Sequence, residues 1–97
     1  MHIISQKKLR DYWHKHPETE FEIRRWYLFA RKANWQTSID VKRVFSSANF
    51  LQNNRVVFNL SGNKLRLVVK MIYEKQRIYI RFMGSHTEYD LISAESV

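Results

Sequence analysis

The sequence predicts a single α+β domain in which N-terminal helices cover one face of a small, mainly antiparallel sheet. Apolar residues recur at helical spacing in the first half of the chain, and from Arg55 onward they recur with the period of two that is typical of strands. The chain has 97 residues, enough for one hydrophobic core and too few for two. Residues 1–97 are therefore expected to form one domain.

The first half of the chain is expected to hold a helical hairpin. A short strand at 1–4 precedes Ser5, a residue type favoured at the N-cap, and apolar positions at helical spacing follow: Leu9, Tyr12, Trp13 and His16. Pro17 suits the first turn of a second helix. That helix carries its own apolar stripe, formed by Ile23, Trp26, Tyr27, Ala30 and Ala33. A capping-box sequence at 37–40 predicts a third, short helix.

Four large aromatic residues of the hairpin are expected to pack in the core or between the helices. They are Trp13, Phe21, Trp26 and Phe29. Burying an aromatic ring contributes more to a small core than burying most other side chains, so this is their ordinary role in a domain of this size. These rings are therefore expected to pack and not to contact a ligand.

Two strands in the second half divide their side chains into an apolar face and a basic face. Lys64, Arg66, Val68, Lys70 and Ile72 alternate with Leu65, Leu67, Val69 and Met71. Likewise Arg77, Tyr79 and Arg81 oppose Ile78, Ile80 and Phe82. The link at 73–76 suits an antiparallel hairpin, as does the turn at 61–63 before the first of these strands. The sheet is expected to expose a polar, cationic face, and a bend at Gly84–Ser85 would bring His86 to it.

The charge balance favours an anionic partner. The chain carries 17 Lys and Arg against nine Asp and Glu, giving a net charge of +8 and a pI near 10.1. A surface of this kind attracts polyanions or, alternatively, an acidic protein.

Several classes of site are excluded by what the sequence lacks. Without cysteine there is no disulfide, zinc ribbon, iron–sulfur site or thiol nucleophile. No P-loop, dinucleotide fingerprint or hydrolase motif occurs, and the acidic residues are dispersed, so neither a metal nor a cofactor is expected. No apolar run approaches the roughly 20 residues that span a bilayer, which predicts a cytoplasmic protein with no membrane segment.

Four segments taken together resemble the HigB branch of the RelE/ParE toxin superfamily. They are residues 1–7, 54–60, 62–69 and 84–90, the last three holding Val-Phe-Asn, Gly-Asn-x-x-Arg and His-x-Glu-Tyr-Asp blocks. The resemblance covers essentially the whole chain. It implies a RelE-like fold and a toxin of a type II toxin–antitoxin system that cleaves mRNA, usually on the translating ribosome. It also implies neutralisation by a HigA antitoxin with a helix-turn-helix domain. This antitoxin partner is expected to contact the helical hairpin at 18–33, the basic sheet, or both.

The resemblance, read with the residues present, implies a metal-independent reaction in which the RNA 2′-hydroxyl attacks the adjacent phosphate. Arg66 and Arg81 would stabilise the added negative charge, and His86 would transfer protons. Tyr89 would position RNA, stack on a base or assist proton transfer. The residues expected to bind flanking RNA are Lys64, Lys70, Arg77 and Tyr79, although Tyr79 could equally make a cross-strand aromatic contact.

Two alternatives remain open from the sequence. The same basic sheet could serve a non-catalytic RNA-binding module. The chain could also be a ParE-like toxin acting on gyrase, because the superfamily includes toxins with that target and a fold does not determine a target.

Overall fold

The structure, a computed structural model, describes residues 1–62 and 64–97. Asn63, the last residue of the predicted turn at 61–63, lies outside the described residues. The α-helices are α1 (Gln6–Lys15), α2 (Glu20–Lys32), α3 (Ser38–Val44) and α4 (His86–Tyr89). The strands are β1 (His2–Ile4), β2 (Asn49–Phe50), β3 (Arg55–Leu60), β4 (Leu65–Ile72) and β5 (Arg77–Ser85), with short 3₁₀ turns at Pro17–Thr19 and Tyr73–Lys75.

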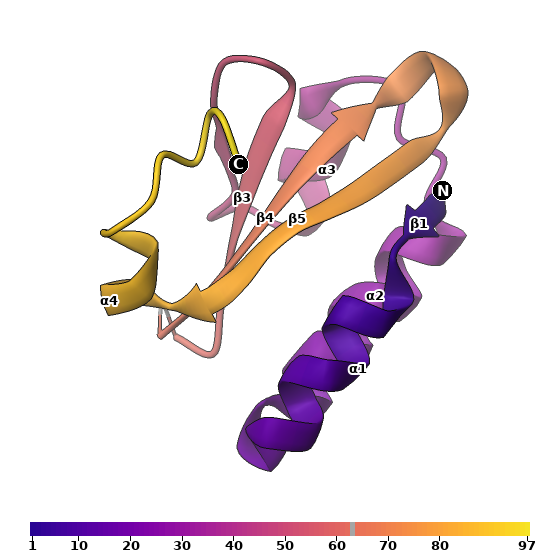
Figure 1. The fold of residues 1–97 in the computed structure, drawn as a ribbon. Coiled ribbons are helices and arrows are strands. Elements are labelled where there is room, and N and C mark those ends of the chain that lie inside the picture. The colour runs from indigo at the N-terminus through magenta and orange to yellow at the C-terminus, as the bar shows by residue number, and fades with distance from the viewer. Residues whose placement is uncertain (63) are drawn as a thin grey trace.

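The strands form one five-stranded sheet in the order β1-β5-β4-β3-β2. The pairs β2–β3, β3–β4 and β4–β5 are antiparallel, whereas β1 pairs with β5 in parallel. Figure 1 shows α1 and α2 side by side on one side of the β4–β5 hairpin, with α4 and the C-terminal segment on the other. The predicted α+β class and mainly antiparallel sheet are confirmed; β2 and the parallel pairing of β1 were not predicted.

Local sequence accounts for most helix boundaries. Pro17 opens a 3₁₀ turn, and α2 starts at Glu20, so the two helices are joined by a compact corner. Thr37 and Asp40 form the predicted capping box of α3. Ser5 occupies the N-cap of α1, but its side chain makes no capping hydrogen bond. Within the described part of the chain, no helix is long and apolar enough to cross a membrane.

The main core lies between the helices and one face of the sheet. Trp26 of α2 and Phe58 of β3 are fully buried, with ring centroids 5.3 Å apart. Phe45 and Trp35 pack on the same Phe58 ring at 5.3 and 6.5 Å. Strand residues with the predicted alternation complete this core: Leu65, Leu67, Val69 and Met71 from β4, with Ile78 and Ile80 from β5. The apolar face was therefore predicted correctly through Ile80.

The opposite face of the sheet carries a second apolar cluster, so the prediction of a polar face is wrong for its middle. Val57 and Val68 are buried there beneath Ala94. The C-terminal segment supplies most of the cover, because half-buried side chains surround these three residues: Leu51, Phe82, Tyr89, Ile92 and Val97. The valines at 57 and 68 are the reason, since two adjacent apolar positions on a solvated face would leave apolar area in water.

A β-bulge in β5 changes which side chains share a face. Val69 pairs with Ile80 and Val68 pairs with Phe82, so Arg81 is the extra residue. Phe82 therefore joins the second apolar cluster and not the main core, which corrects the predicted grouping of Phe82 with Ile78 and Ile80. The strand also continues through Gly84 to Ser85, so the expected bend lies at the start of α4 instead.

Two of the four aromatic residues assigned to the core are in fact exposed. Trp26 is fully buried and Trp13 packs against the core, as predicted. Phe21, in contrast, exposes 74% of its surface and Phe29 exposes 46%. Both lie on the outward face of α2, where the adjoining helices leave them uncovered.

Candidate active site

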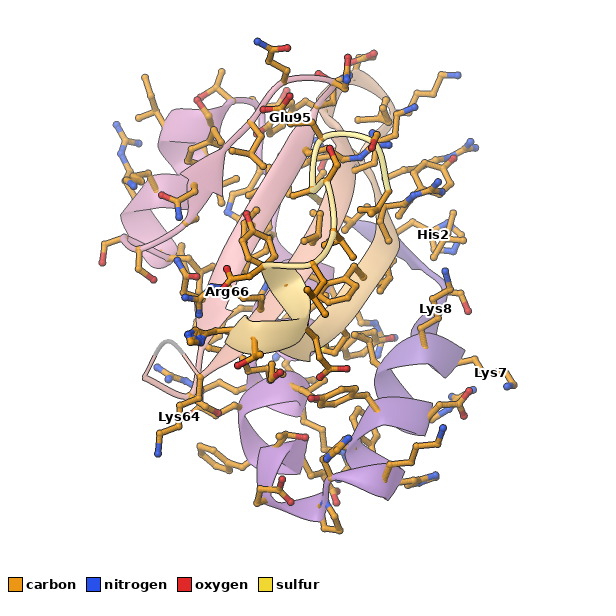
Figure 2. All side chains as sticks on the ribbon, turned by 60° about the vertical axis from the view of Figure 1, so that its left-hand side comes forward. His2, Lys7, Lys8, Lys64, Arg66 and Glu95 are labelled. Atoms are coloured by element: carbon orange, nitrogen blue, oxygen red, sulfur yellow. The ribbon has the colours of Figure 1, made fainter. Side chains whose placement is uncertain are left out.

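The second apolar cluster divides the predicted basic face into two ends. Arg66 and Lys70 lie on opposite sides of the buried Val68 in β4, four residues and therefore about 13 Å apart. The C-terminal segment runs over Val57 and Val68 from α4, beside Arg66, to Glu95 at the far end of the sheet (Figure 2), where the Glu95 carbonyl oxygen accepts a hydrogen bond from Asn53. The two ends consequently have different neighbours and can be tested separately.

The first end, here called the Arg66 corner, comprises Lys64, Arg66, His86 and Tyr89. The Arg66 guanidinium carbon is 5.9 Å from the centroid of the Tyr89 ring, within the range of a cation–π contact. The backbone N–H of His86 donates to the carbonyl oxygen of Lys64 at 3.2 Å. Lys64 and His86 are exposed, whereas Arg66 and Tyr89 are half-buried. Figure 2 shows Arg66 beside α4 and Lys64 at the neighbouring end of β4.

A capping box fixes the short helix that carries His86 and Tyr89. The Glu88 N–H donates to the Ser85 hydroxyl at 3.2 Å, and the Ser85 N–H donates to the Glu88 carboxylate at 2.9 Å. These hydrogen bonds from Ser85, backbone first, lower the pKa of Glu88 below its usual 4.5. The carboxylate therefore stabilises the cap at neutral pH, and this contribution is lost as the pH falls through the lowered pKa.

Gly84 brings Arg66 and Tyr89 together by leaving room for Phe82. A Cβ atom at Gly84 would lie 2.7 Å from Cζ of the Phe82 ring, so the ring occupies the space that a side chain would need. Phe82 in turn packs 6.5 Å from the Tyr89 ring. Because Gly84 pairs with Arg66 across the sheet, Tyr89 is held between Phe82 and the Arg66 guanidinium.

The second end, here called the Lys70 hollow, is an open depression of about 380 Å³ lined by Lys70, Ile72, Glu74, Lys75, Tyr79 and Arg81. Lys70 and Tyr79 are directly opposite each other in the β4–β5 register. Arg77 pairs with Ile72 at the end of the same strands and is exposed. The structure thus places Lys70, Arg77, Tyr79 and Arg81 at this end, away from the Arg66 corner.

Arg81 is engaged by the C-terminal segment. Its Nε donates to the main-chain oxygen of Val97 at 3.1 Å. Arg55 binds the same oxygen through Nε at 3.1 Å and Nη2 at 2.7 Å. Arg81 therefore lies on the Lys70 side of Phe82, where it lines the Lys70 hollow and binds the Val97 oxygen.

Arg55 is a nearly fully buried cation that the sequence analysis did not propose as a site residue. It pairs with Lys70 across β3 and β4, which places two cations side by side. Two adjacent buried or half-buried cations need oxygen acceptors. Arg55 also donates to the Asn53 carbonyl at 2.9 Å. The like-charge pair was the available sequence signal, but it could not reveal that a segment 42 residues away supplies the acceptor.

Comparison with known proteins agrees with this fold. Residues 19–92 match the HigB toxin family, described as the RelE-like toxic component of a toxin–antitoxin system. The chain is 34% identical over 96 residues to the mRNA interferase toxin HigB of Escherichia coli K12, covering 97% of this chain and 92% of the relative. The mRNA interferase HigB of Shigella flexneri matches to the same extent, and that of E. coli O6:H1 is 24% identical over 95 residues. This chain belongs to the HigB toxin family.

Proposed function

We propose that this chain is an endoribonuclease toxin that cleaves mRNA on the translating ribosome in the cytoplasm and is neutralised by a HigA-like helix-turn-helix antitoxin. The observation that supports it best is the Arg66 corner, where a guanidinium, a phenol and the start of α4 meet on an exposed cationic surface. The relatives named as mRNA interferases add to this support.

In the proposed reaction the RNA 2′-oxygen attacks the adjacent phosphorus and the bond from phosphorus to the 5′-oxygen breaks. The products are a 2′,3′-cyclic phosphate and a free 5′-hydroxyl. One proton leaves the attacking hydroxyl and one is delivered to the leaving oxygen. His86 is the proposed proton-transfer group because an imidazole side chain can both accept and donate a proton. Arg66 would stabilise the charge added to the phosphate oxygens, and Tyr89 would orient the nucleotide.

The residues at the Lys70 hollow are proposed to hold the flanking RNA. Lys70 and Arg77 would contact phosphates, and Tyr79 would offer a ring for base stacking. Arg81 would assist Arg66 on the reacting phosphate only after exchanging its hydrogen bond to Val97 for one to the RNA. Lys64 would contact the phosphate next to the cleaved bond at the Arg66 corner.

The purified toxin is expected to cut mRNA bound to translating ribosomes and to leave 2′,3′-cyclic phosphate ends. The toxin is treated with EDTA and desalted before mixing, because EDTA in the reaction would dissociate the ribosomes. Cleavage sites are mapped by primer extension, and the ends are identified by their resistance to ligation until the cyclic phosphate is removed. The Mg²⁺ that the ribosomes need is present throughout. The metal-independent step would therefore be contradicted by activity that is lost after EDTA treatment and restored by Mn²⁺ or Zn²⁺, or by cleavage that leaves 5′-phosphate and 3′-hydroxyl ends. Bound but uncut RNA would support a binding module, and inhibited gyrase with intact mRNA would support a ParE-like toxin.

The two ends of the basic face are expected to contribute separately to RNA binding. Neutralising Lys64 and Arg66 to Gln, or Lys70 and Arg77 to Gln, should lower the salt slope for single-stranded RNA by about 0.7 per lost phosphate contact. Binding is measured by fluorescence anisotropy between 50 and 300 mM salt. The matched control neutralises Arg31 and Lys32, which are exposed in the last turn of α2. A pair whose loss leaves the slope at the control value does not contact RNA.

A further inference from the structure

Four exposed apolar side chains gather on the outward face of α2 and the adjoining end of α3. Phe21 is 74% exposed, Leu28 51%, Phe29 46% and Val44 47%. Single exposed apolar residues are common on proteins, whereas contiguous ones mark interaction sites. These four are contiguous, because Leu28 and Phe29 border one hollow with Phe21 and another with Val44. They are named here the α2 apolar surface.

Helical geometry explains why this surface cannot be part of the core. Ile23, Trp26 and Ala30 project from α2 into the main core and are fully buried. Phe21, Leu28 and Phe29 follow the spacing i, i+7 and i+8, which places them together on the opposite side of the same helix. Burial of one stripe therefore requires exposure of the other within this chain.

The surface is shaped to receive a row of side chains. The hollow along α2 between Phe21 and Phe29 has a volume of about 580 Å³, and Leu28 also borders a hollow of about 320 Å³ toward α1 and one of about 360 Å³ toward α3. Phe21 and Phe29 are eight residues apart, or about 12 Å along the helix. Apolar side chains at i, i+3, i+4 and i+7 of a partner helix have this reach.

Cations surround the α2 apolar surface. Arg10, Arg24, Arg25 and Lys32 line the three hollows, and the one carboxylate among the lining residues, Glu20, is paired with Arg24 at 3.2 Å. Arg25 lies over the Phe29 ring at 5.7 Å from its centroid, and Arg24 lies over Trp13 at 5.3 Å. A segment that covers these rings must therefore accept the neighbouring guanidinium groups, which favours Asp and Glu at its edges.

The same charges argue against a second copy of this chain. In a two-fold dimer the surface would face itself, so each cationic rim would meet an identical one. The whole chain carries a net charge of +8, which adds repulsion at longer range.

We infer that the α2 apolar surface is the docking site for an acidic amphipathic helix of the partner antitoxin. Leu28, at the junction of the three hollows, is the central anchor point, with Phe21 and Phe29 on either side along α2 and Arg24 and Arg25 as the rim. The inference rests on membership of a toxin–antitoxin family and needs no RNA cleavage. If the proposed RNA cleavage is disproved, the docking inference is therefore unaffected. If the docking inference is disproved, the proposed RNA cleavage is likewise unaffected.

The test uses isothermal titration calorimetry to measure how tightly the full-length partner antitoxin binds the Leu28→Asp variant and the parent chain. A central interface residue of this kind is expected to cost about 30-fold or more in affinity. The matched control is Leu91→Asp, since Leu91 is 84% exposed but lies after α4 on the other side of the sheet. Circular dichroism and thermal unfolding verify the fold, and Leu28→Asp should cleave RNA at the rate of the parent chain.

A second experiment tests whether the segment that docks on the α2 apolar surface is an acidic amphipathic helix. Synthetic peptides for each helix of the antitoxin are titrated onto the toxin, and one acidic amphipathic peptide should bind, lose affinity with salt and weaken with Arg25→Glu. Unchanged antitoxin binding by Leu28→Asp would overturn the inference, as would binding confined to a basic or extended segment. Sedimentation showing a toxin dimer that Leu28→Asp dissolves would assign the surface to a second copy instead.

Discussion

His86→Ala is expected to slow RNA cleavage by about 10²- to 10⁴-fold, the usual contribution of a positioned acid–base group. The folding free energy should change little, because His86 is exposed at the first position of α4 and the Ser85–Glu88 capping box does not use its side chain. Single-turnover cleavage of mRNA on ribosomes is the measurement, since it separates chemistry from product release. Arg66→Ala should lose about 10²- to 10³-fold by the same assay.

The matched control for the histidine is His14→Ala, an exposed histidine in the last turn of α1. For the arginine it is Arg43→Ala on α3, which makes a surface pair with Asp40 at 3.7 Å. Both controls should cleave at the parent rate. Wild-type cleavage by His86→Ala would show that histidine is not the proton-transfer group. Tyr89, or stabilisation by the arginines alone, would then be the better account.

Phe58→Ala is expected to cost about 3–5 kcal/mol of folding free energy, the usual range for removing a buried phenylalanine ring. Phe58 is fully buried and is the one ring that contacts Trp26, Trp35 and Phe45 among the described aromatic pairs. Three large rings cannot collapse into the space that one ring leaves, so the upper part of the range is expected. Urea unfolding monitored by tryptophan fluorescence measures the change.

The control for this change is Phe50→Ala, which removes the same ring from the edge strand β2. Phe50 is 37% exposed and has Lys42 Nζ 5.9 Å from its ring centroid. Its loss should cost well under half of the Phe58 value. Equal losses at the two positions would mean that the rings around Phe58 rearrange to refill its space.

Local signals predicted the elements well because their causes are local. The capping box at Thr37 and Asp40, the apolar stripe of Ile23, Trp26 and Ala30, and the alternation along β4 each depend on spacing within one element. The parallel pairing of β1 with β5 depends on contacts far apart in the chain, and no local pattern specifies it. The same applies to the outward position of Phe21 and Phe29, since only the packing of whole helices decides which side of α2 is covered.

The sequence did not predict how the proposed site residues are arranged. The residues proposed from sequence lie on the sheet face that carries Val57 and Val68, or at the border of that face. Arg81 is nevertheless separated from the Arg66 corner by the β-bulge in β5 and by the C-terminal segment that covers Val68. A bulge adds one residue without changing the hydrophobic pattern enough to be recognised. Arg55 was missed because its acceptor, the Val97 oxygen, belongs to a segment with no periodic pattern.

The pairing of β1 with β5 bears on how this chain is made. His2 pairs with Arg77, so the first strand has no neighbour in the sheet until most of the chain has left the ribosome. At about 5–20 residues per second that delay is roughly 4 to 15 seconds. Helices α1, α2 and α3 can form early, but the face that carries Arg66 and Tyr89 is assembled from the second half of the chain. We therefore expect the growing polypeptide to be harmless to its own ribosome for most of synthesis, with the ability to damage RNA acquired only as translation ends.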